Sequence, residues 1–191
     1  MINKYSNLIQ NFWQLSLDDV FNKIANKDML PSGGATIGIN LISSMSLVIM
    51  VFKMTLKKIK YDNDVLSDIL STKINNLTII LTDSQKLTLL DMQLFYNFMQ
   101  SKDDIHLTQL IDNSITLLQK ILDFLTELKN LKISQFLKID IQIATLYLQS
   151  SSEAIILNII INLQQNEKLK IKYQNTYKNY QQKIKKLIKE L

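Results

Sequence analysis

Glycine and proline are almost absent from this chain, and the few present are confined to one short stretch. The 191 residues include three glycines and one proline, and all four lie in "MLPSGGATIGIN", residues 29–40. A sheet of many strands needs turn residues at each reversal, and this chain has too few of them. The sequence therefore predicts an all-α fold of long helices, in a single domain that covers residues 1–191.

The composition excludes several classes of site. The chain has no cysteine, so it can form neither a disulfide nor a thiolate metal site, and we expect a cytoplasmic location. Its one histidine, His106, has no second histidine nearby, so no metal site is expected. The N-terminus shows no basic segment followed by an apolar run, and we therefore expect no signal peptide.

The positive charge is gathered at the C-terminal end. Residues 167–191 hold eight lysines against two glutamates, whereas the whole chain has a net charge of +5. Apolar residues also recur along this segment, namely Leu169, Ile171, Tyr173, Tyr177, Tyr180, Ile184, Leu187 and Leu191. We expect a solvated outer helix with one apolar side and no nucleic-acid partner. The alternative is a basic helix that touches RNA or an anionic membrane.

Hydrophobic periodicity predicts six to seven helices with long antiparallel members at the centre. A capping box at Ser16 marks the start of the second helix, which should end by Lys27. The helix after the glycines is apolar on all sides as far as Phe52, which predicts a buried central helix. The expected segments are 5–14, 17–27, 35–60, 64–99, 105–128, 139–163 and 167–191.

A membrane-spanning interpretation competes with a buried helix for one segment. Residues 35–52 contain no charge and approach the length needed to cross a bilayer. The same segment carries polar side chains, among them Thr36, Asn40, Ser43 and Ser44, and the second candidate, 141–163, carries glutamines, serines, a glutamate and asparagines. We therefore expect no membrane partner.

The glycine turn has the chemistry of a binding site. A Pro-Ser-Gly-Gly turn that enters a helix leaves free N–H groups at the helix start, and two positions lack a Cβ that would keep a ligand away. Such a turn can hold an anion or a planar ring that bears a carbonyl. The alternative is a tight turn between helices without any ligand.

Helix arithmetic places one carboxylate beside this turn. If 35–60 and 64–99 form an antiparallel hairpin that turns near Asp62, Asp91 lies level with Gly33. Asp91 also sits on a largely apolar face, where a carboxylate has a raised pKa unless it is paired. It could stabilise a cationic carbon or activate water. The alternative is a surface aspartate on the outer edge of the helix.

Several segments, in their order along the chain, resemble the cyclodeaminase/cyclohydrolase family. They are the short capped helix, "LPSGGAT", the apolar helix that ends "MTLKKIKY", "LLDMQLFYNFM", and "IDIQIATLYLQSSSEAIILNIIINL". The resemblance covers nearly the whole chain. It implies an all-α homodimer that acts on a tetrahydrofolate carrying a one-carbon unit, without a metal or a further cofactor.

The resemblance also implies which residues form the site. The catalytic residues would be Asp91 and Asp140. The substrate-binding residues would be Ser32, Gly33, Gly34, Thr36, Lys57, Lys58, Tyr61, Asn158 and Asn162. In this scheme the asparagines bind the pterin or backbone amides, and the lysines bind the glutamate carboxylates of the folate.

These residues cannot all meet within one chain. Asp140 and Asn158 are five helical turns apart, roughly 27 Å in a continuous helix. We expect the two asparagines near the glycine turn and Asp140 near the far end with the lysines. A two-fold antiparallel dimer would join the two ends in a composite site.

The implied reaction is hydrolysis of 5,10-methenyltetrahydrofolate to 10-formyltetrahydrofolate. One alternative is a formiminotetrahydrofolate cyclodeaminase. Another is a non-catalytic helical dimer derived from the family, because the chain departs from the family pattern at Ser32, Ala35, Ile139 and the pair Ile133-Ser134.

Overall fold

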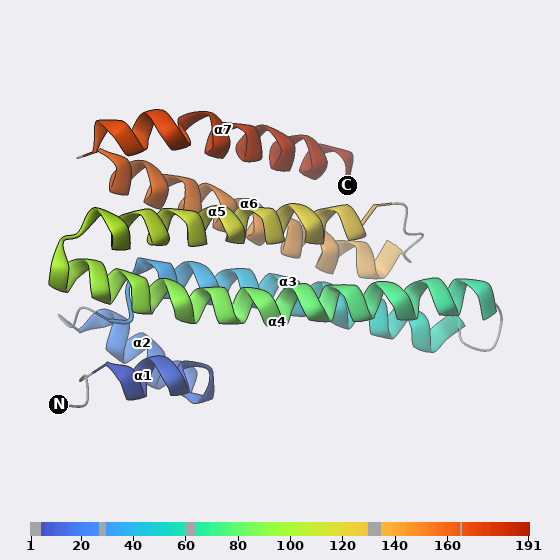
Figure 1. The fold of residues 1–191 in the computed structure, drawn as a ribbon. Coiled ribbons are helices and arrows are strands. Elements are labelled where there is room, and N and C mark those ends of the chain that lie inside the picture. Colours follow the sequence, from blue (N-terminus) through green and yellow to red (C-terminus); the bar gives the residue numbers. More distant parts are fainter. Residues whose placement is uncertain (1–4, 27–29, 60–63, 130–134, 165) are drawn as a thin grey trace.

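The computed structural model describes residues 5–26, 30–59, 64–129, 135–164 and 166–191 (Figure 1). The described residues form seven α-helices and one 3-10 turn, and they contain no strand. The all-α prediction is therefore confirmed. The elements are α1 (Ser6–Asn11), η1 (Phe12–Gln14), α2 (Leu17–Ala25), α3 (Gly33–Ile59), α4 (Asp64–Ser101), α5 (Asp104–Glu127), α6 (Gln135–Leu163) and α7 (Glu167–Glu190).

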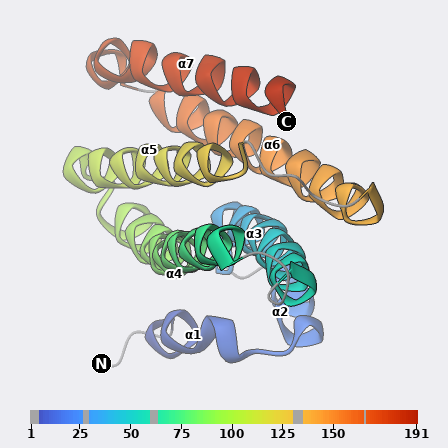
Figure 2. The same cartoon turned by 90° about the vertical axis from the view of Figure 1, so that its right-hand side faces the viewer.

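The five long helices stack in layers. Viewed from one end, α7 covers α5 and α6, these two lie over α4 and α3, and α1 and α2 cover the opposite side (Figure 2). α3 packs on both α4 and α6, and α4 also packs on α5. The start of α3, the end of α4, the start of α5 and the end of α6 meet at one end of the bundle (Figure 1). We call this the glycine end, because the Pro-Ser-Gly-Gly turn lies there.

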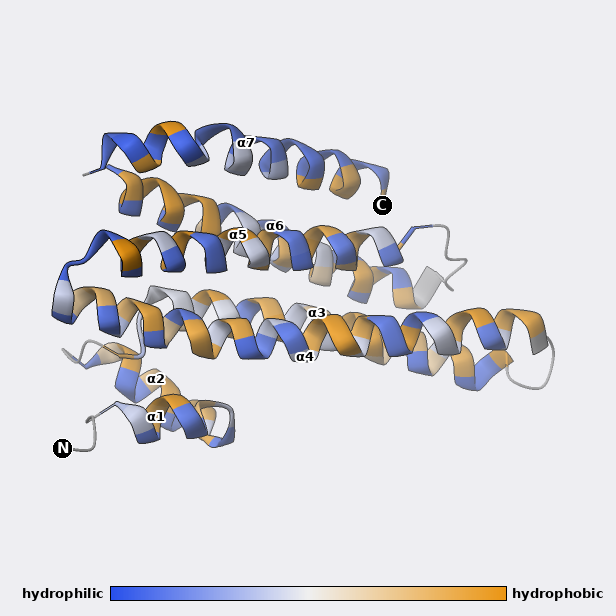
Figure 3. Cartoon of the chain, in the orientation of Figure 1, coloured by the Kyte–Doolittle hydropathy of each residue, from blue (hydrophilic) through white to orange (hydrophobic). Residues whose placement is uncertain are grey.

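Hydropathy explains which helices are central. α3 and α6 are apolar over most of their surface, whereas α7 is mostly hydrophilic (Figure 3). The main core joins these long helices through fully buried side chains such as Phe52, Phe124 and Leu77. A smaller core under α1 and α2 contains Phe12 and Met92. Burial of this apolar surface is the main force that holds the bundle together.

Side-chain caps mark where several helices begin. The Ser16 hydroxyl accepts a hydrogen bond from the Asp19 backbone N–H at 3.1 Å, which confirms the predicted cap of α2. Asp103 caps α5 by accepting from the Ile105 N–H at 2.8 Å. Each cap satisfies one of the N–H groups that a helix start leaves free.

The C-terminal helix is the outer helix that the sequence predicts. All eight lysines of residues 167–191 are exposed, while Tyr173 and Ile184 are buried against the bundle. The Tyr173 hydroxyl also donates to Asp112 of α5 at 2.6 Å. The prediction that Ile171 and Leu191 belong to the apolar side of this helix is wrong, since Ile171 is 70% exposed and Leu191 is 45% exposed.

Two helices are long and apolar enough to cross a membrane by length and composition alone. They are Gly33–Ile59 and Leu137–Leu163, and 56% and 39% of their most apolar windows are buried within the bundle. The central position of α3 accounts for its apolar character, because it packs against α4 and α6. The lower burial of α6 leaves an apolar face open.

Candidate functional site

The glycine end begins with the turn that starts α3. The carbonyl of Ser32 accepts hydrogen bonds from the N–H groups of Ala35 at 3.1 Å and Thr36 at 3.3 Å, so Ser32 begins the helical ladder. Gly33 is exposed, and a Cβ built on it would have no atom within 4 Å. Open space therefore lies beside the first turn of α3, where helix N–H groups lack intrahelical partners.

Asp91 lies directly against Gly34. A Cβ at Gly34 would lie 1.8 Å from Asp91 Oδ2 and 2.9 Å from Asp91 Cγ. Any residue other than glycine at this position would therefore force the Asp91 side chain or the backbone to move. Asp91 is only 4% exposed. The predicted proximity of Asp91 to the glycine turn is thus confirmed, and the alternative of a surface aspartate is wrong. Gly34 has a structural reason to be glycine: the carboxylate occupies the place of its side chain.

Burial alters the acidity of this carboxyl group. Loss of solvent raises the pKa of Asp91 from 3.8 to about 6, and a side-chain hydrogen bond from Asn113 opposes the rise. At pH 7 most of the Asp91 population is ionised, and about half of it is protonated at pH 6. An acid of this strength can both accept and donate a proton in a reaction near neutral pH.

Asn113 of α5 is a site residue that the sequence reasoning missed. Its Nδ2 donates to the carbonyl of Leu87 at 3.0 Å, and its buried Oδ1 has no hydrogen-bond partner among the described residues. The available signal was an asparagine at helical spacing between Leu110 and Leu117, which points to the buried side of α5. Asn113 also lines a groove of about 330 Å³ between α4 and α5.

A second cavity lies on the opposite face of α3. It measures about 580 Å³ and runs between α2, α3 and α6, and we call it the serine cleft. Asn40 donates to Ser151 Oγ at 3.1 Å within it, and the predicted Thr36 lies at its rim. The other lining residues are Phe21, Ile37, Ile39, Ser43, Tyr147, Ser150 and Ala154. Sequence reasoning missed Asn40, Ser150 and Ser151, although a run of serines in an apolar helix is a visible signal.

Asn158 and Asn162 lie toward the glycine end, as expected. Thr36 and Ala154 border the same cleft, so the last turns of α6 lie beside the first turns of α3. Asn158 follows Ala154 by one helical turn and therefore points to the same side. Asn162 follows one turn later and is half-buried.

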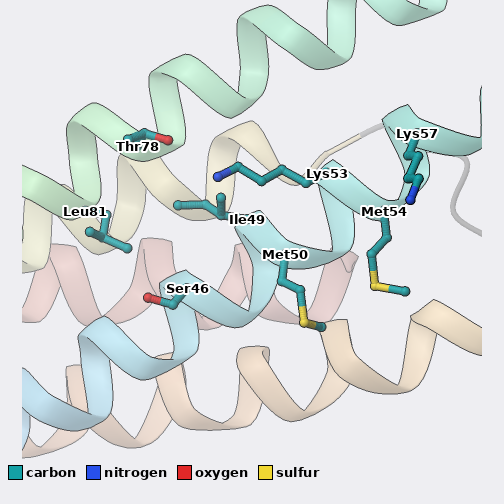
Figure 4. A pocket seen from close by; sticks show the side chains of 8 residues that line it. All are labelled: Ser46, Ile49, Met50, Lys53, Met54, Lys57, Thr78 and Leu81. Carbon is teal, nitrogen blue, oxygen red and sulfur yellow. The ribbon is translucent and has the colours of Figure 1, made fainter. Parts of the chain in front are cut away.

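Lys57, Lys58 and Asp140 lie at the other end of the bundle. Lys57 is 24 residues beyond Gly33 on one helix, which corresponds to about 36 Å. It lines an open groove of about 540 Å³ between α3 and α4, together with Met50, Lys53 and Met54 (Figure 4). Asp140 belongs to the first turns of α6. Within one chain the structure therefore divides the predicted residues between two ends.

Two further expectations concern individual residues. Tyr61 lies outside the described residues. His106 is half-buried, and its Nδ1 lies 2.8 Å from the hydroxyl of Ser101. In the part of the chain that the structure describes, no group of three or more histidine and acidic side chains is placed to hold a metal ion.

Known proteins match the chain at the level of family and of fold. The family model described as formiminotransferase-cyclodeaminase matches residues 16–186. The fold is similar to that of formiminotetrahydrofolate cyclodeaminase from Thermotoga maritima, with a TM-score of 0.84, 17% identity and 94% of each chain covered. No curated protein sequence gives a match. At 17% identity the structural likeness concerns the fold, whereas the family model spans nearly all of the elements described above.

Proposed function

Since this chain belongs to the formiminotransferase-cyclodeaminase family, we propose that it hydrolyses 5,10-methenyltetrahydrofolate to 10-formyltetrahydrofolate. The observation that supports this most is Asp91, a buried carboxyl group pressed against the first turn of α3. Its pKa of about 6 suits proton transfer near neutral pH. The proposed reaction uses water and the side chains of the protein.

In this reaction Asp91 acts on the attacking water. The methenyl carbon carries positive charge, and an ionised carboxylate beside it stabilises that charge. The oxygen of water bonds to this carbon while Asp91 takes one proton, which then leaves to solvent. The bond from the carbon to N5 breaks, the remaining hydroxyl proton moves to N5, and the formyl group stays on N10.

The glycine end offers groups that could hold the substrate. Ser32, Gly33 and Thr36 border the exposed first turn of α3, where N–H groups can donate to the carbonyl of the pterin. Asn158 and Asn162 add amides on the side of the serine cleft. Asp91 and the cleft lie on different faces of α3, so the substrate would pass over the exposed turn that joins them.

We propose that two copies of the chain complete the site. Large apolar side chains recur at helical spacing on the open face of α6, namely Ile139, Ile143, Leu146, Leu157 and Ile161. A second copy that covers this face in antiparallel orientation would bring Lys57, Lys58 and Asp140 of one protomer toward the glycine end of the other. The lysines would then bind the anionic tail of the folate, and Asp140 would supply the second carboxylate.

A second candidate reaction follows from the solved structure with the same fold, whose name describes a formiminotetrahydrofolate cyclodeaminase. In that reaction the formimino group closes onto N10 and ammonia leaves. Protonated Asp91 would donate the proton that the leaving ammonia needs. Both candidate reactions place Asp91 beside the same carbon of the folate. The cyclohydrolase reaction starts with Asp91 ionised, whereas the cyclodeaminase reaction needs it protonated.

The experiment presents the purified protein with each folate separately. Cyclohydrolase activity consumes the absorbance of methenyltetrahydrofolate, whereas cyclodeaminase activity releases ammonia from formiminotetrahydrofolate. We expect turnover of the methenyl compound. Ammonia release alone would favour the cyclodeaminase. Folate binding without turnover of either compound would show a non-catalytic member of the family.

A further inference from the structure

The side chain of Asn113 is anchored on the same turn of α4 that carries Asp91. Its Nδ2 donates to the carbonyl of Leu87 at 3.0 Å, and Leu87 precedes Asp91 by one helical turn. In an α-helix this carbonyl is also the acceptor for the N–H of Asp91. The amide of Asn113 is therefore tied to the peptide group that fixes the position of Asp91.

We propose that Asn113 is a positioning residue for Asp91, which donates its second amide N–H to the carboxylate and so stabilises the ionised form. Nδ2 has two hydrogens, of which one goes to Leu87. The side-chain hydrogen bond from Asn113 opposes the effect of burial on the pKa of Asp91. The geometry places the amide beside the turn that carries Asp91, and the lowering of the pKa of Asp91 by Asn113 agrees with a bond to the carboxylate.

The unpaired oxygen of Asn113 indicates that the amide does not serve packing alone. Asn113 is 5% exposed, and no group in the described part of the chain bonds to its Oδ1. A buried acceptor without a donor destabilises a fold, and a leucine at this position would avoid that cost. If the amide were turned over, Oδ1 of Asn113 would take the place of Nδ2 beside the carbonyl oxygen of Leu87. Two acceptor oxygens would then meet without a hydrogen between them. The orientation that leaves Oδ1 unpaired is also the one that turns Nδ2 toward α4.

Among the residues that the structure describes, no charged group acts on Asp91 in the way that Asn113 does. α3 contributes Gly34, which is uncharged. On α4, Asp83 is paired with Lys120 at 2.8 Å, and Lys86 is exposed. On α5, Asp112 accepts a hydrogen bond from Tyr173. The pKa of Asp91 is governed by burial and by Asn113, without a contribution from these charged groups.

The role of Asn113 in catalysis rests on the function proposed above, but its effect on Asp91 does not. With the amide present, most of the Asp91 population is ionised at pH 7 and can accept a proton from water. Without the amide, burial acts unopposed and the population shifts toward the neutral acid. The acid limb of the pH–rate profile would then move to higher pH.

The test titrates Asp91 by carboxyl-carbon NMR in the folded full-length chain. Its resonance is assigned by its disappearance in Asp91→Asn. Asn113→Leu keeps the size of the side chain and leaves the Leu87 carbonyl bonded within its helix, and Asn113→Val serves if the leucine variant does not fold. Thr116→Val is the control, because Thr116 lines the same groove and its hydroxyl bonds to its own helix at Asp112.

We expect Asn113→Leu to raise the pKa of Asp91 by about one unit, a tenfold weaker acid, and Thr116→Val to leave it unchanged. An unchanged or lowered pKa in the Asn113 variants would overturn the proposal. The readout needs no substrate. Failure of the folate assay would therefore leave this result intact, and failure here would leave the folate assay intact.

Discussion

At the scale of single residues, two adjacent glycines have different tasks. Gly34 makes room for the Asp91 carboxylate, whereas Gly33 faces open space. Neither requires a positive φ, since no glycine of the chain has one. The need for glycine at position 34 is therefore steric and arises from a residue 57 positions away in the sequence.

This difference predicts opposite effects of the same substitution. Gly34→Ala places a methyl group 1.8 Å from Asp91 Oδ2 and should lower the free energy of unfolding by about 1–3 kcal/mol. Gly33→Ala should be neutral or stabilising by about 0.5 kcal/mol, because alanine restricts the unfolded chain. Urea denaturation measures both. Equal effects of the two substitutions would show that the carboxylate does not lie against Gly34.

The raised pKa of Asp91 predicts a pH-dependent stability. The folded pKa of about 6 exceeds the ordinary value of 3.8, so the folded state binds this proton more tightly than the unfolded state. The contribution of the group is therefore complete below about pH 4 and is lost as the pH rises through 6, by roughly 3 kcal/mol in all. Asp91→Asn removes this loss.

Urea denaturation between pH 4 and pH 8 measures the effect. The stability of Asp91→Asn relative to the unchanged protein should rise across this range and level off above pH 7. Asp68→Asn, at an exposed position of the same helix, should follow the unchanged protein. Parallel curves for the unchanged protein and Asp91→Asn would contradict the assignment.

At the scale of elements, the pairing of α3 with α4 was predictable and the placement of α5 was not. α4 follows α3 after a short connection. Counting residues outward from that connection along both helices therefore sets Asp91 level with the glycines. The level of Asn113 depends on the turn after Ser101 and on how side chains of α4 and α5 interlock. The serine cleft likewise depends on the packing of α6 on α3. Such details of packing leave no periodic signal in a single sequence.

A third glycine tests the α3–α4 contact. A Cβ at Gly38 would lie 2.2 Å from Thr88 Cγ2, so the absence of a side chain at this position permits close packing of the two helices. Gly38→Ala should therefore cost about 1–3 kcal/mol of stability. Adding Thr88→Ala removes the obstructing atoms and should recover part of the loss. Strictly additive costs would show that the two positions do not touch.

At the scale of the whole molecule, the packing of a single chain does not explain why one face of α6 exposes large apolar side chains. Leu146 and Leu157 are 65% and 59% exposed on a helix whose residues are mostly apolar. Sequence alone predicted the number and order of the helices, because caps and apolar periods mark them. It could not show which face of α6 stays open, because the polar residues of this helix are spread around it and mark no single exterior side.

The proposed dimer makes a prediction at this scale. Leu157→Lys places a charge in the proposed interface and should convert the dimer to monomer, as measured by light scattering after size exclusion. Ile171→Lys is the matched control, since Ile171 is 70% exposed on α7, away from that face. A dimer that tolerates Leu157→Lys, or a chain that is monomeric from the start, would contradict the proposed composite site.

The account depends most on Asp91 as the group that moves the proton, and its most direct test is the rate of methenyltetrahydrofolate hydrolysis by two variants. Asp91→Asn keeps the shape of the side chain and removes its proton chemistry, whereas Asp68→Asn makes the same change at an exposed position of α4. We predict that kcat/KM falls about a hundredfold or more in Asp91→Asn and stays within about twofold in Asp68→Asn. Full activity in Asp91→Asn would contradict the account.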